Sequence, residues 1–235
     1  MINVLLACEE SQATTSELRK LGYNAYSCDI LPTSGPMPEY HIQDDIFNVI
    51  ENYHIKWDLM IAHPPCTYLT TSGARWMYHP DDKHLPTSQR RPHPKHPNRK
   101  QQQQDAIDFF LKLMNADIEY IAIENPVGVL STKYRKPDCI VQPYHFGDEA
   151  TKTTCFWLKN LPVLQPTNIV GKGEFKTWRD KNGKLKRQSK SSYNALSNTK
   201  THAERRTLRS KTFQGMAEAM ANQWGNYVCN KKISI

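Results

Sequence analysis

The sequence contains no CxxC pair, no apolar run long enough to span a membrane, and no glycine in the turn after its first strand-like segment. No signal-peptide pattern precedes Asn3. The six cysteines do not have zinc spacing, so we expect neither a disulfide framework nor a metal site. These absences predict a cytoplasmic protein with reduced thiols and no membrane partner.

Acidic residues are fewer than basic residues, with 23 Asp and Glu against 31 Lys and Arg. The net charge of +8 and the isoelectric point of about 9.1 favour a polyanionic partner, with a merely basic surface as the simpler alternative. Hydrophobic residues make up only 38% of the chain. The apolar runs at 3–7 and 120–123 are nevertheless typical of strands, so we expect a packed core beside long polar loops.

Strand-like and helix-like segments alternate over residues 1–62. Strands separated by helix-length segments predict an α/β fold, in which helices pack on the faces of a parallel sheet. The expected strands cover residues 3–7, 24–29 and 57–62, and the expected helices cover residues 11–21 and 46–53.

After Pro126 the spacing of apolar residues shifts toward two, which predicts an antiparallel part of the sheet. Near the end of the chain, Met216, Met220 and Trp224 lie at helical spacing, a pattern more typical of a core than of a cofactor site. The expected elements are a helix at 106–114, a strand at 120–124, paired strands at 140–146 and 154–158, and a helix at 213–228.

Two long stretches, residues 74–104 and 165–211, lack an apolar period and are rich in Lys and Arg. We expect one domain over residues 1–235, in which the first stretch is a long loop and the second is a basic insertion. Loops of this length are usually functional or disordered.

Acidic residues follow several of the expected strands. Ligands bind beyond the carboxyl ends of parallel strands, so these acids are candidates for a ligand site, although such acids are often helix N-caps. The turn after the first strand has two carboxylates and no glycine, which makes it a poor cradle for pyrophosphate. A nucleoside ligand without phosphates, such as S-adenosylmethionine, suits it better. The acids are Glu9, Glu10, Asp29, Asp44 and Asp45.

Cys66 follows a predicted strand and two prolines, Pro64 and Pro65. The prolines stiffen the backbone, so the thiol is either a small buried group at a strand end or a nucleophile held out on a turn. Glu124 follows the next strand and should lie at the same edge of the sheet. Apolar walls would raise the pKa of Glu124 and make it a proton donor, whereas the alternative is an exposed loop acid.

The motifs around Cys66 and Glu124, with Gly73 seven residues past the cysteine, resemble those of the DNA (cytosine-5) methyltransferase family. The chain looks like the compact phage and prophage members, which lack a large target-recognition domain and belong with restriction–modification enzymes. This resemblance implies the Rossmann-like fold of S-adenosylmethionine-dependent methyltransferases. The matching segments are ACEES (7–11), CDILP (28–32), DLMIAHPPCTYLTTSGARW (58–76), IENPVG (123–128), QPYHFGDEATKTTCFWLKNLP (142–162) and GMAEAMANQW (215–224).

The resemblance implies a role for each matching residue. Cys66 would attack C6 of a flipped cytosine, and Glu124 would protonate N3 and bind the exocyclic amine, with Lys152 beside them. The methyl group of S-adenosylmethionine would then go to C5. The implied cofactor residues are Ala7, Cys8, Glu9, Glu10, Ser11, Asp29, Ile30, Asp45, Ile46, Pro64 and Gly215, with Asp29 at the ribose and Asp45 at the adenine amine. The implied DNA contacts are Thr67, Thr70, Ser72, Gly73, Arg75, Trp76, Arg90, Arg91, Lys152 and Thr154.

The chain also departs from the family. Cys8 and Glu10 stand where the family has glycines, which bears on the pose of the cofactor. Lys152 stands where the family has an arginine, so it keeps the charge but loses the bidentate geometry. Residues 170–211 replace the recognition domain, and we expect them to contact phosphates and to read little sequence.

The 74–104 loop would be the mobile catalytic loop and DNA clamp, with Trp76 and Tyr78 filling the gap left by a flipped base. We expect a monomeric enzyme on double-stranded DNA. One alternative keeps the chemistry but acts on RNA or single-stranded DNA, and another is a non-catalytic anti-restriction decoy that binds nucleic acid. A decoy needs neither Cys66 nor Glu124, so their joint presence favours the enzyme.

Overall fold

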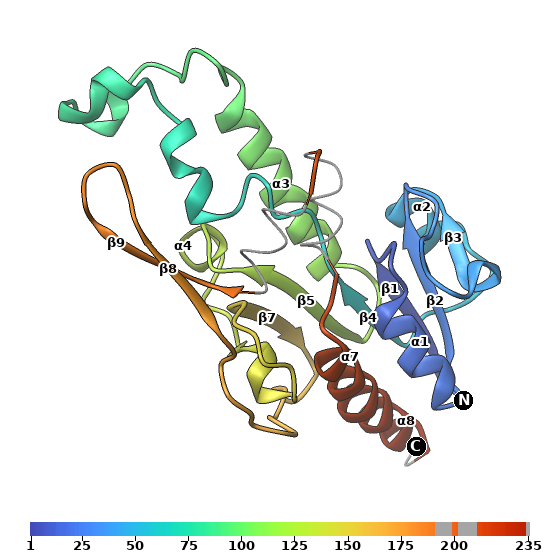
Figure 1. Cartoon of the computed structure of the whole chain (residues 1–235). Coiled ribbons are helices and arrows are strands. Elements are labelled where there is room, and N and C mark those ends of the chain that lie inside the picture. Colours follow the sequence, from blue (N-terminus) through green and yellow to red (C-terminus); the bar gives the residue numbers. More distant parts are fainter. Residues whose placement is uncertain (191–198, 202–210, 234–235) are drawn as a thin grey trace.

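The computed structural model describes residues 1–190, 199–201 and 211–233, and its main sheet carries helices on both faces (Figure 1). The strands are β1 (Asn3–Ala7), β2 (Asn24–Asp29), β3 (His41–Gln43), β4 (Leu59–Ala62), β5 (Tyr120–Pro126), β6 (Cys139–Val141), β7 (Thr154–Lys159), β8 (Phe175–Arg179) and β9 (Leu185–Ser189). The α-helices are α1 (Ala13–Lys20), α2 (Ile46–Asn52), α3 (Arg99–Met114), α4 (Leu130–Lys133), α7 (Gln214–Met220) and α8 (Asn226–Ile233), and the short π-helix η6 (Ala221–Gly225) joins the last two.

The seven-stranded sheet has the order β3-β2-β1-β4-β5-β7-β6. The strands from β3 to β5 run parallel, whereas β7 runs antiparallel to both β5 and β6. This arrangement confirms the predicted α/β fold with a mostly parallel sheet and an antiparallel part toward the C-terminal side. A separate antiparallel hairpin is formed by β8 and β9.

Neighbouring residues of each central strand face opposite sides of the sheet, and this alternation builds two cores. Val4 packs on the side covered by α1, α7 and α8, whereas Leu5 packs on the side covered by α2 and α3. Met216, Met220 and Trp224 are at most 2% exposed in the first core, which confirms that this stripe belongs to the core. All six cysteines lie among the described residues, and none forms a disulfide.

Some element bounds differ from those expected. The strand predicted at 140–146 ends at Val141, because Pro143 lacks an N–H and starts the short helix η5 (Pro143–His145). Strand β3 was missed, since three residues carry too little periodicity. In the described part of the chain, no helix combines the length and the apolar character that crossing a membrane requires.

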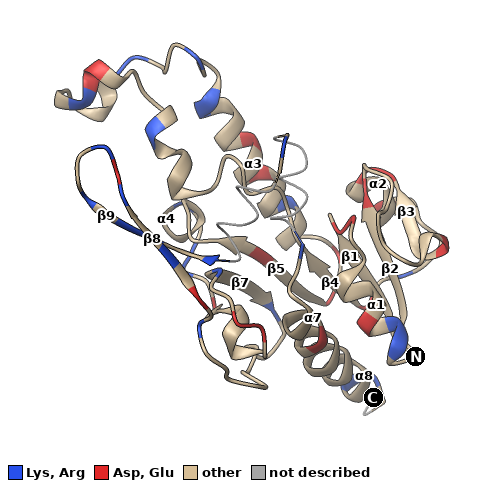
Figure 2. Cartoon of the chain, in the orientation of Figure 1, with Lys and Arg blue, Asp and Glu red and all other residues tan. Residues whose placement is uncertain are grey.

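The two stretches without apolar periodicity have different structures. Residues 74–98 contain short helical turns, and helix α3 begins at Arg99. The short helices are η1 (Pro38–Tyr40), η2 (Thr71–Trp76), η3 (Pro80–His84) and η4 (Thr87–Gln89). Within 165–211, the β8–β9 hairpin was missed because its alternating residues are mostly polar, while residues 191–198 and 202–210 lie outside the described residues. Figure 2 shows Lys and Arg along both the loop and the hairpin.

Candidate active site

The site lies where the direction of strand order reverses, between β1 and β4. Ala7 is in register with Ala62, and Ala62 is in register with Ile123. The turns after β1, β4 and β5 therefore leave neighbouring strands at one edge, the place where open α/β sheets bind ligands. A hydrogen bond from His63 N to Ala7 O, 2.9 Å long, continues the pairing past the end of β4.

The turn after β1 replaces the expected glycine by a strained cysteine. Cys8 has φ +58°, in the left-handed region that glycine adopts most readily. The backbone thus keeps a glycine-like conformation even though the residue has a side chain. Burial raises the pKa of the Cys8 thiol, and the nearby carboxylates of Asp29 and Asp45 raise it further. This thiol stays protonated at neutral pH and is a poor nucleophile.

The side chain of Glu9 forms hydrogen bonds with the start of helix α1. Its carboxylate is buried and accepts hydrogen bonds from Thr14 N at 2.7 Å, Thr15 N at 3.2 Å and Thr15 Oγ1 at 2.6 Å. It therefore satisfies the unpaired amides at the start of the helix and places a negative charge at the positive end of the helix dipole. The negative charge of Glu9 would repel a phosphate at this helix start, which agrees with a ligand that lacks phosphates.

Two further acids at this edge each hold a backbone amide. Asp29 Oδ1 accepts from Leu31 N at 2.9 Å, and Asp45 Oδ1 accepts from Phe47 N at 2.8 Å. Asp45 thus caps α2, as the N-cap alternative predicted. Among the described residues, the second oxygen of each carboxylate has no hydrogen-bond donor, so both acids have an oxygen for a ligand. Ile30, next to Asp29, is 71% exposed and offers an apolar surface beside it.

These features fit S-adenosylmethionine. Its hydroxyl and amine groups need acceptors, which the second oxygens of Asp29 and Asp45 supply, and its adenine needs an apolar surface such as Ile30. Glu10 and Ser11 are half-buried in the same turn, while Ile46 is buried behind Asp45.

Cys66 lies on a compact turn after β4 and is exposed. Its carbonyl accepts hydrogen bonds from Leu69 N at 3.0 Å and Thr70 N at 3.2 Å, so the turn closes on itself. Pro64 is buried, and its carbonyl accepts from Asn125 Nδ2 at 3.2 Å. That bond joins the Pro-Pro-Cys turn directly to the segment that carries Glu124.

Glu124 lies inside β5 and contacts His63, a residue that the sequence analysis did not single out. His63 Nδ1 and Glu124 Oε2 are 3.4 Å apart, with side chains 10% and 16% exposed. Burial raises the pKa of Glu124, but the hydrogen bond from His63 and the positive charge of Lys152 outweigh it, and the pKa is lowered overall. The expected raised pKa is therefore wrong, because the carboxylate has polar partners rather than purely apolar walls.

A small hollow lies beside Glu124. Its volume is about 10 Å³, enough for one water molecule and far too small for a pyrimidine ring. A base can reach Glu124 from this side only if neighbouring side chains move. His63 Nε2 is buried with no hydrogen-bond partner among the described residues. The lining residues are His63, Glu124, Lys152, Thr154, Phe156, Thr212, Met216 and Met220.

Two glycines hold the loops of the site close together. A Cβ at Gly128 would lie 2.0 Å from Leu69 O, and that carbonyl accepts a hydrogen bond from Val129 N at 2.9 Å. A Cβ at Gly73 would lie 2.2 Å from Arg99 Nη2. Both glycines thus allow close approach, and Gly128 joins the loop after Cys66 to the loop after Glu124.

Other predicted site residues are partly engaged in local structure. Thr70 Oγ1 and Ser72 Oγ are 3.0 Å apart, and Thr154 is buried with its Oγ1 donating to Lys152 O. Gly215 donates its N–H to Asp148 Oδ2, and a Cβ there would lie 1.8 Å from Phe146 O, so packing alone explains this glycine. Exposed positions are held by Thr67, Ser72, Arg75 and Arg91.

No protein-family model matches the chain, and no curated protein matches it. Structures similar to it include a candidate DNA modification methyltransferase encoded within a prophage (E. coli), at 14% identity and TM-score 0.42, over 83% of this chain and 64% of that one. A mutant DNMT2 from Spodoptera frugiperda has 13% identity and TM-score 0.38, over 73% and 55%. Dnmt2 methyltransferase from S. pombe has 14% identity and TM-score 0.35, over 69% and 50%. The chain thus spans between half and two thirds of their lengths, and the functional argument rests on its own residues.

Proposed function

We propose that this protein is an S-adenosylmethionine-dependent methyltransferase that methylates C5 of cytosine in DNA. The observation that carries the proposal is the coupling of Cys66 and Glu124. An exposed thiol and a largely buried carboxylate leave adjacent parallel strands, and the Asn125–Pro64 hydrogen bond joins their turns. A nucleophile beside an acid–base group at this edge is the arrangement that addition to a pyrimidine ring requires.

In the proposed reaction, the Cys66 thiolate adds to C6 of cytosine, so a carbon–sulfur bond forms and the C5–C6 double bond is lost. N3 takes up a proton from solvent as the electron pair moves to a C4–C5 double bond. The ionised Glu124 accepts hydrogen bonds from this N3–H and from the exocyclic amine. S-adenosylmethionine, when bound, supplies an electrophilic methyl group. After C5 carries the methyl group, loss of the C5 proton to solvent restores the C5–C6 double bond and releases the Cys66 thiolate, and N3 returns its proton to solvent.

His63 and Lys152 are proposed as positioning residues for Glu124. His63 donates its Nδ1–H to the carboxylate, while the charge of Lys152 keeps the carboxylate ionised. Removing either group should raise the pKa of Glu124 and move the acidic limb of the pH–rate profile to higher pH. Lys152→Arg should restore the wild-type profile, whereas a merely structural role for Lys152 would lower activity without moving the profile.

The proposed substrate is double-stranded DNA from which the target base is flipped, because C5 and C6 are not accessible to a thiol inside the duplex stack. The basic residues of the 74–104 loop and of the β8–β9 hairpin would contact phosphates. The same chemistry on RNA or single-stranded DNA is the second candidate. It is favoured by the small size of the described hairpin, five residues in each strand, where a large recognition domain would otherwise read duplex sequence.

The test uses tritiated S-adenosylmethionine with mixed-sequence duplex DNA, single-stranded DNA and RNA. We expect label at cytosine C5 from the wild type and none from Cys66→Ala. DNA containing 5-fluorocytosine, which has no C5 proton to lose, should trap a covalent adduct with the wild type only. Labelling that persists in Cys66→Ala, or label at another atom, would refute the proposal. DNA binding without S-adenosylmethionine binding in calorimetry would instead support the non-catalytic decoy.

A further inference from the structure

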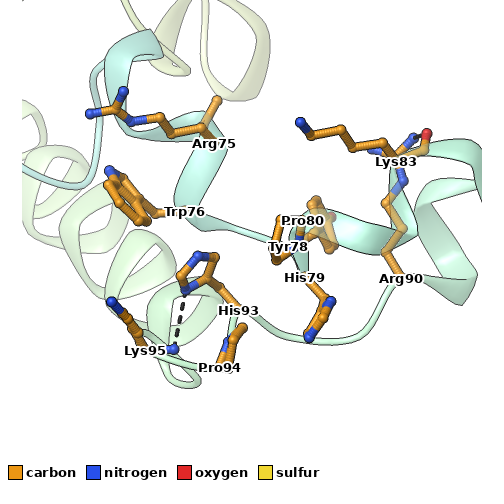
Figure 3. A pocket seen from close by; sticks show the side chains of 11 residues that line it. Arg75, Trp76, Tyr78, His79, Pro80, Lys83, Arg90, His93, Pro94 and Lys95 are labelled. Carbon is orange, nitrogen blue, oxygen red and sulfur yellow. Dashed lines mark hydrogen bonds between the residues drawn. The ribbon is translucent and has the colours of Figure 1, made fainter.

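A second, larger hollow lies in the 74–98 loop, and its lining includes neither Cys66 nor Glu124. Its volume is about 480 Å³, which is in the range of small-molecule binding pockets (Figure 3). Among the described residues that line it, four are positively charged and none is negatively charged. These residues are Ala74, Arg75, Trp76, Tyr78, His79, Pro80, Lys83, Arg90, His93, Pro94 and Lys95.

Hydrogen bonds within the loop give this hollow its shape. Asp82 is only 3% exposed and accepts from Arg91 N at 2.8 Å, Arg91 Nε at 3.0 Å and Arg91 Nη2 at 2.6 Å. These bonds hold the pKa of Asp82 well below its usual range. The Arg91 carbonyl in turn accepts from His79 N at 2.9 Å. The two sides of the loop are thus joined, so the hollow is built before a ligand arrives.

Aromatic rings form part of the wall. Trp76 meets the rings of His93 and His96 edge-on, with centroids 5.0 and 5.2 Å away. Tyr78 lies below two cations, Lys100 at 4.8 Å and Arg90 at 5.8 Å from its ring centroid. Because Trp76 is packed in this way, inserting it into a duplex would break contacts within the loop.

The positive charge of the hollow comes from fixed cations. Arg90 is held by hydrogen bonds from its Nε to Leu85 O and from its Nη2 to Lys83 O. The pKa of His93 is lowered by its burial and by the neighbouring His96, so this imidazole is neutral at pH 7. Its Nδ1 accepts from Lys95 N, the bond drawn in Figure 3. The cations that remain for a ligand are Arg75, Lys83, Arg90 and Lys95.

We propose that this hollow binds one unpaired nucleotide of the nucleic-acid substrate, with its base against Tyr78 and the phosphates of the adjoining backbone near Arg75, Lys83 and Lys95. This inference rests on the proposed function and adds to it a recognition site for a nucleotide other than the target cytosine. Stacked bases in an intact duplex do not offer their faces, so aromatic walls select an unpaired base, while the cations select the backbone. A duplex substrate would then be opened locally, so that it presents a second unpaired nucleotide besides the flipped cytosine.

Fluorescence anisotropy with a labelled single-stranded oligonucleotide tests this site. Tyr78→Ala should weaken binding about tenfold, in line with the energy of one stacked base. Lys83→Ala should also weaken binding, and should make it less dependent on salt concentration, because it removes a phosphate contact. Tyr78→Phe keeps the ring and should bind like the wild type. Lys112→Ala is the matched control. Lys112 lies near the C-terminal end of α3, pairs with Glu51 of α2 and does not line the hollow. Circular dichroism checks that each variant folds.

A second probe separates base from phosphate. An abasic oligonucleotide of the same length should bind the wild type as weakly as the intact oligonucleotide binds Tyr78→Ala. Equal binding of the intact, abasic and fully duplex probes, or no effect of Tyr78→Ala, would overturn the inference and leave only a basic surface. Cys66→Ala should bind the oligonucleotide normally, so a failed methylation assay and a failed nucleotide site give different results.

Discussion

The turns after β1 and β4 lie side by side at the same edge of the sheet, yet they present their cysteines in opposite ways. Cys8 has a left-handed backbone and a half-buried side chain, and the pKa of its thiol is raised by desolvation and by neighbouring carboxylates. Cys66 is exposed on a turn that two prolines stiffen. Two residues of the same type, at equivalent ends of adjacent strands, are thus suited to different tasks.

The difference comes from what surrounds each turn. After β1, Glu9 turns inward to cap α1, which makes the turn part of the scaffold. After β4, the Pro64 carbonyl accepts a hydrogen bond from Asn125 and the Cys66 carbonyl accepts from Leu69 N and Thr70 N, while Cys66 itself is exposed. Position at a strand end therefore does not by itself identify a nucleophile.

The largest expected contrast is in catalysis. Cys66→Ala should reduce single-turnover methyl transfer by at least about 10³-fold, because it removes the proposed covalent step. Cys8→Ala should change the reaction less than about tenfold, mainly through the affinity for S-adenosylmethionine. A comparable loss in both variants would end the distinction between the two turns.

The two thiols should also differ in alkylation. Iodoacetamide reacts with thiolates, so Cys66 should be modified at least about tenfold faster than Cys8 between pH 7 and 9, as measured by mass spectrometry of peptides. The raised pKa of Cys8 means that the unfolded chain loses this thiol proton first as the pH increases. The free energy of unfolding should consequently fall above pH 9. Fast alkylation of native Cys8 would contradict the raised pKa of its thiol.

Glu9 tests whether the first turn is scaffold. Glu9→Gln should lower the free energy of unfolding by about 1–2 kcal/mol in urea denaturation, since it removes a charged cap from α1. Glu10→Gln, the neighbouring control, should change it by less than about 0.5 kcal/mol. If the two variants are equally stable, the hydrogen bonds of Glu9 do not stabilise α1, and the view that this turn is part of the scaffold is wrong.

The smallest expected effect is that of Cys8→Gly. Glycine fits φ +58° without strain but gains freedom in the unfolded chain, so the change in unfolding free energy should stay below about 1 kcal/mol. Cys8→Val, with a β-branched side chain in the left-handed region, should be clearly more destabilising. Thermal denaturation of the two variants shows whether the backbone or the thiol matters at this position.

Much of the fold could be predicted from the sequence, because the central strands are long and continuously apolar. The core stripe of the last helix was equally clear from the spacing of Met216, Met220 and Trp224. The hairpin at 175–189 could not be predicted, since most of its side chains are exposed and its strands carry no apolar alternation. Such strands depend on backbone pairing and on the Asp180–Lys184 turn.

The candidate site was only partly predictable. Cys66 and Glu124 could be placed at one edge from strand order alone. The contact of His63 with Glu124 could not, because it depends on the register of β4 and β5, and this contact reverses the expected direction of the Glu124 pKa. One signal in the sequence could have indicated this contact. His63 comes directly after Ala62, and Glu124 comes directly after Ile123, the residue that pairs with Ala62. Asp82 was likewise overlooked, although it is an acid within a strongly basic loop.

Arg99 closes the 74–98 loop at its base. This residue begins α3, lies over Gly73 and donates to Thr67 O at 3.2 Å, so both ends of the loop meet at one buried guanidinium. Because the entropy of loop closure changes slowly with length, the loop can be shortened, extended or exchanged without moving Cys66. If this loop contacts the substrate as proposed, exchanging residues 74–98 should alter the range of substrates while the Cys66 turn stays in place.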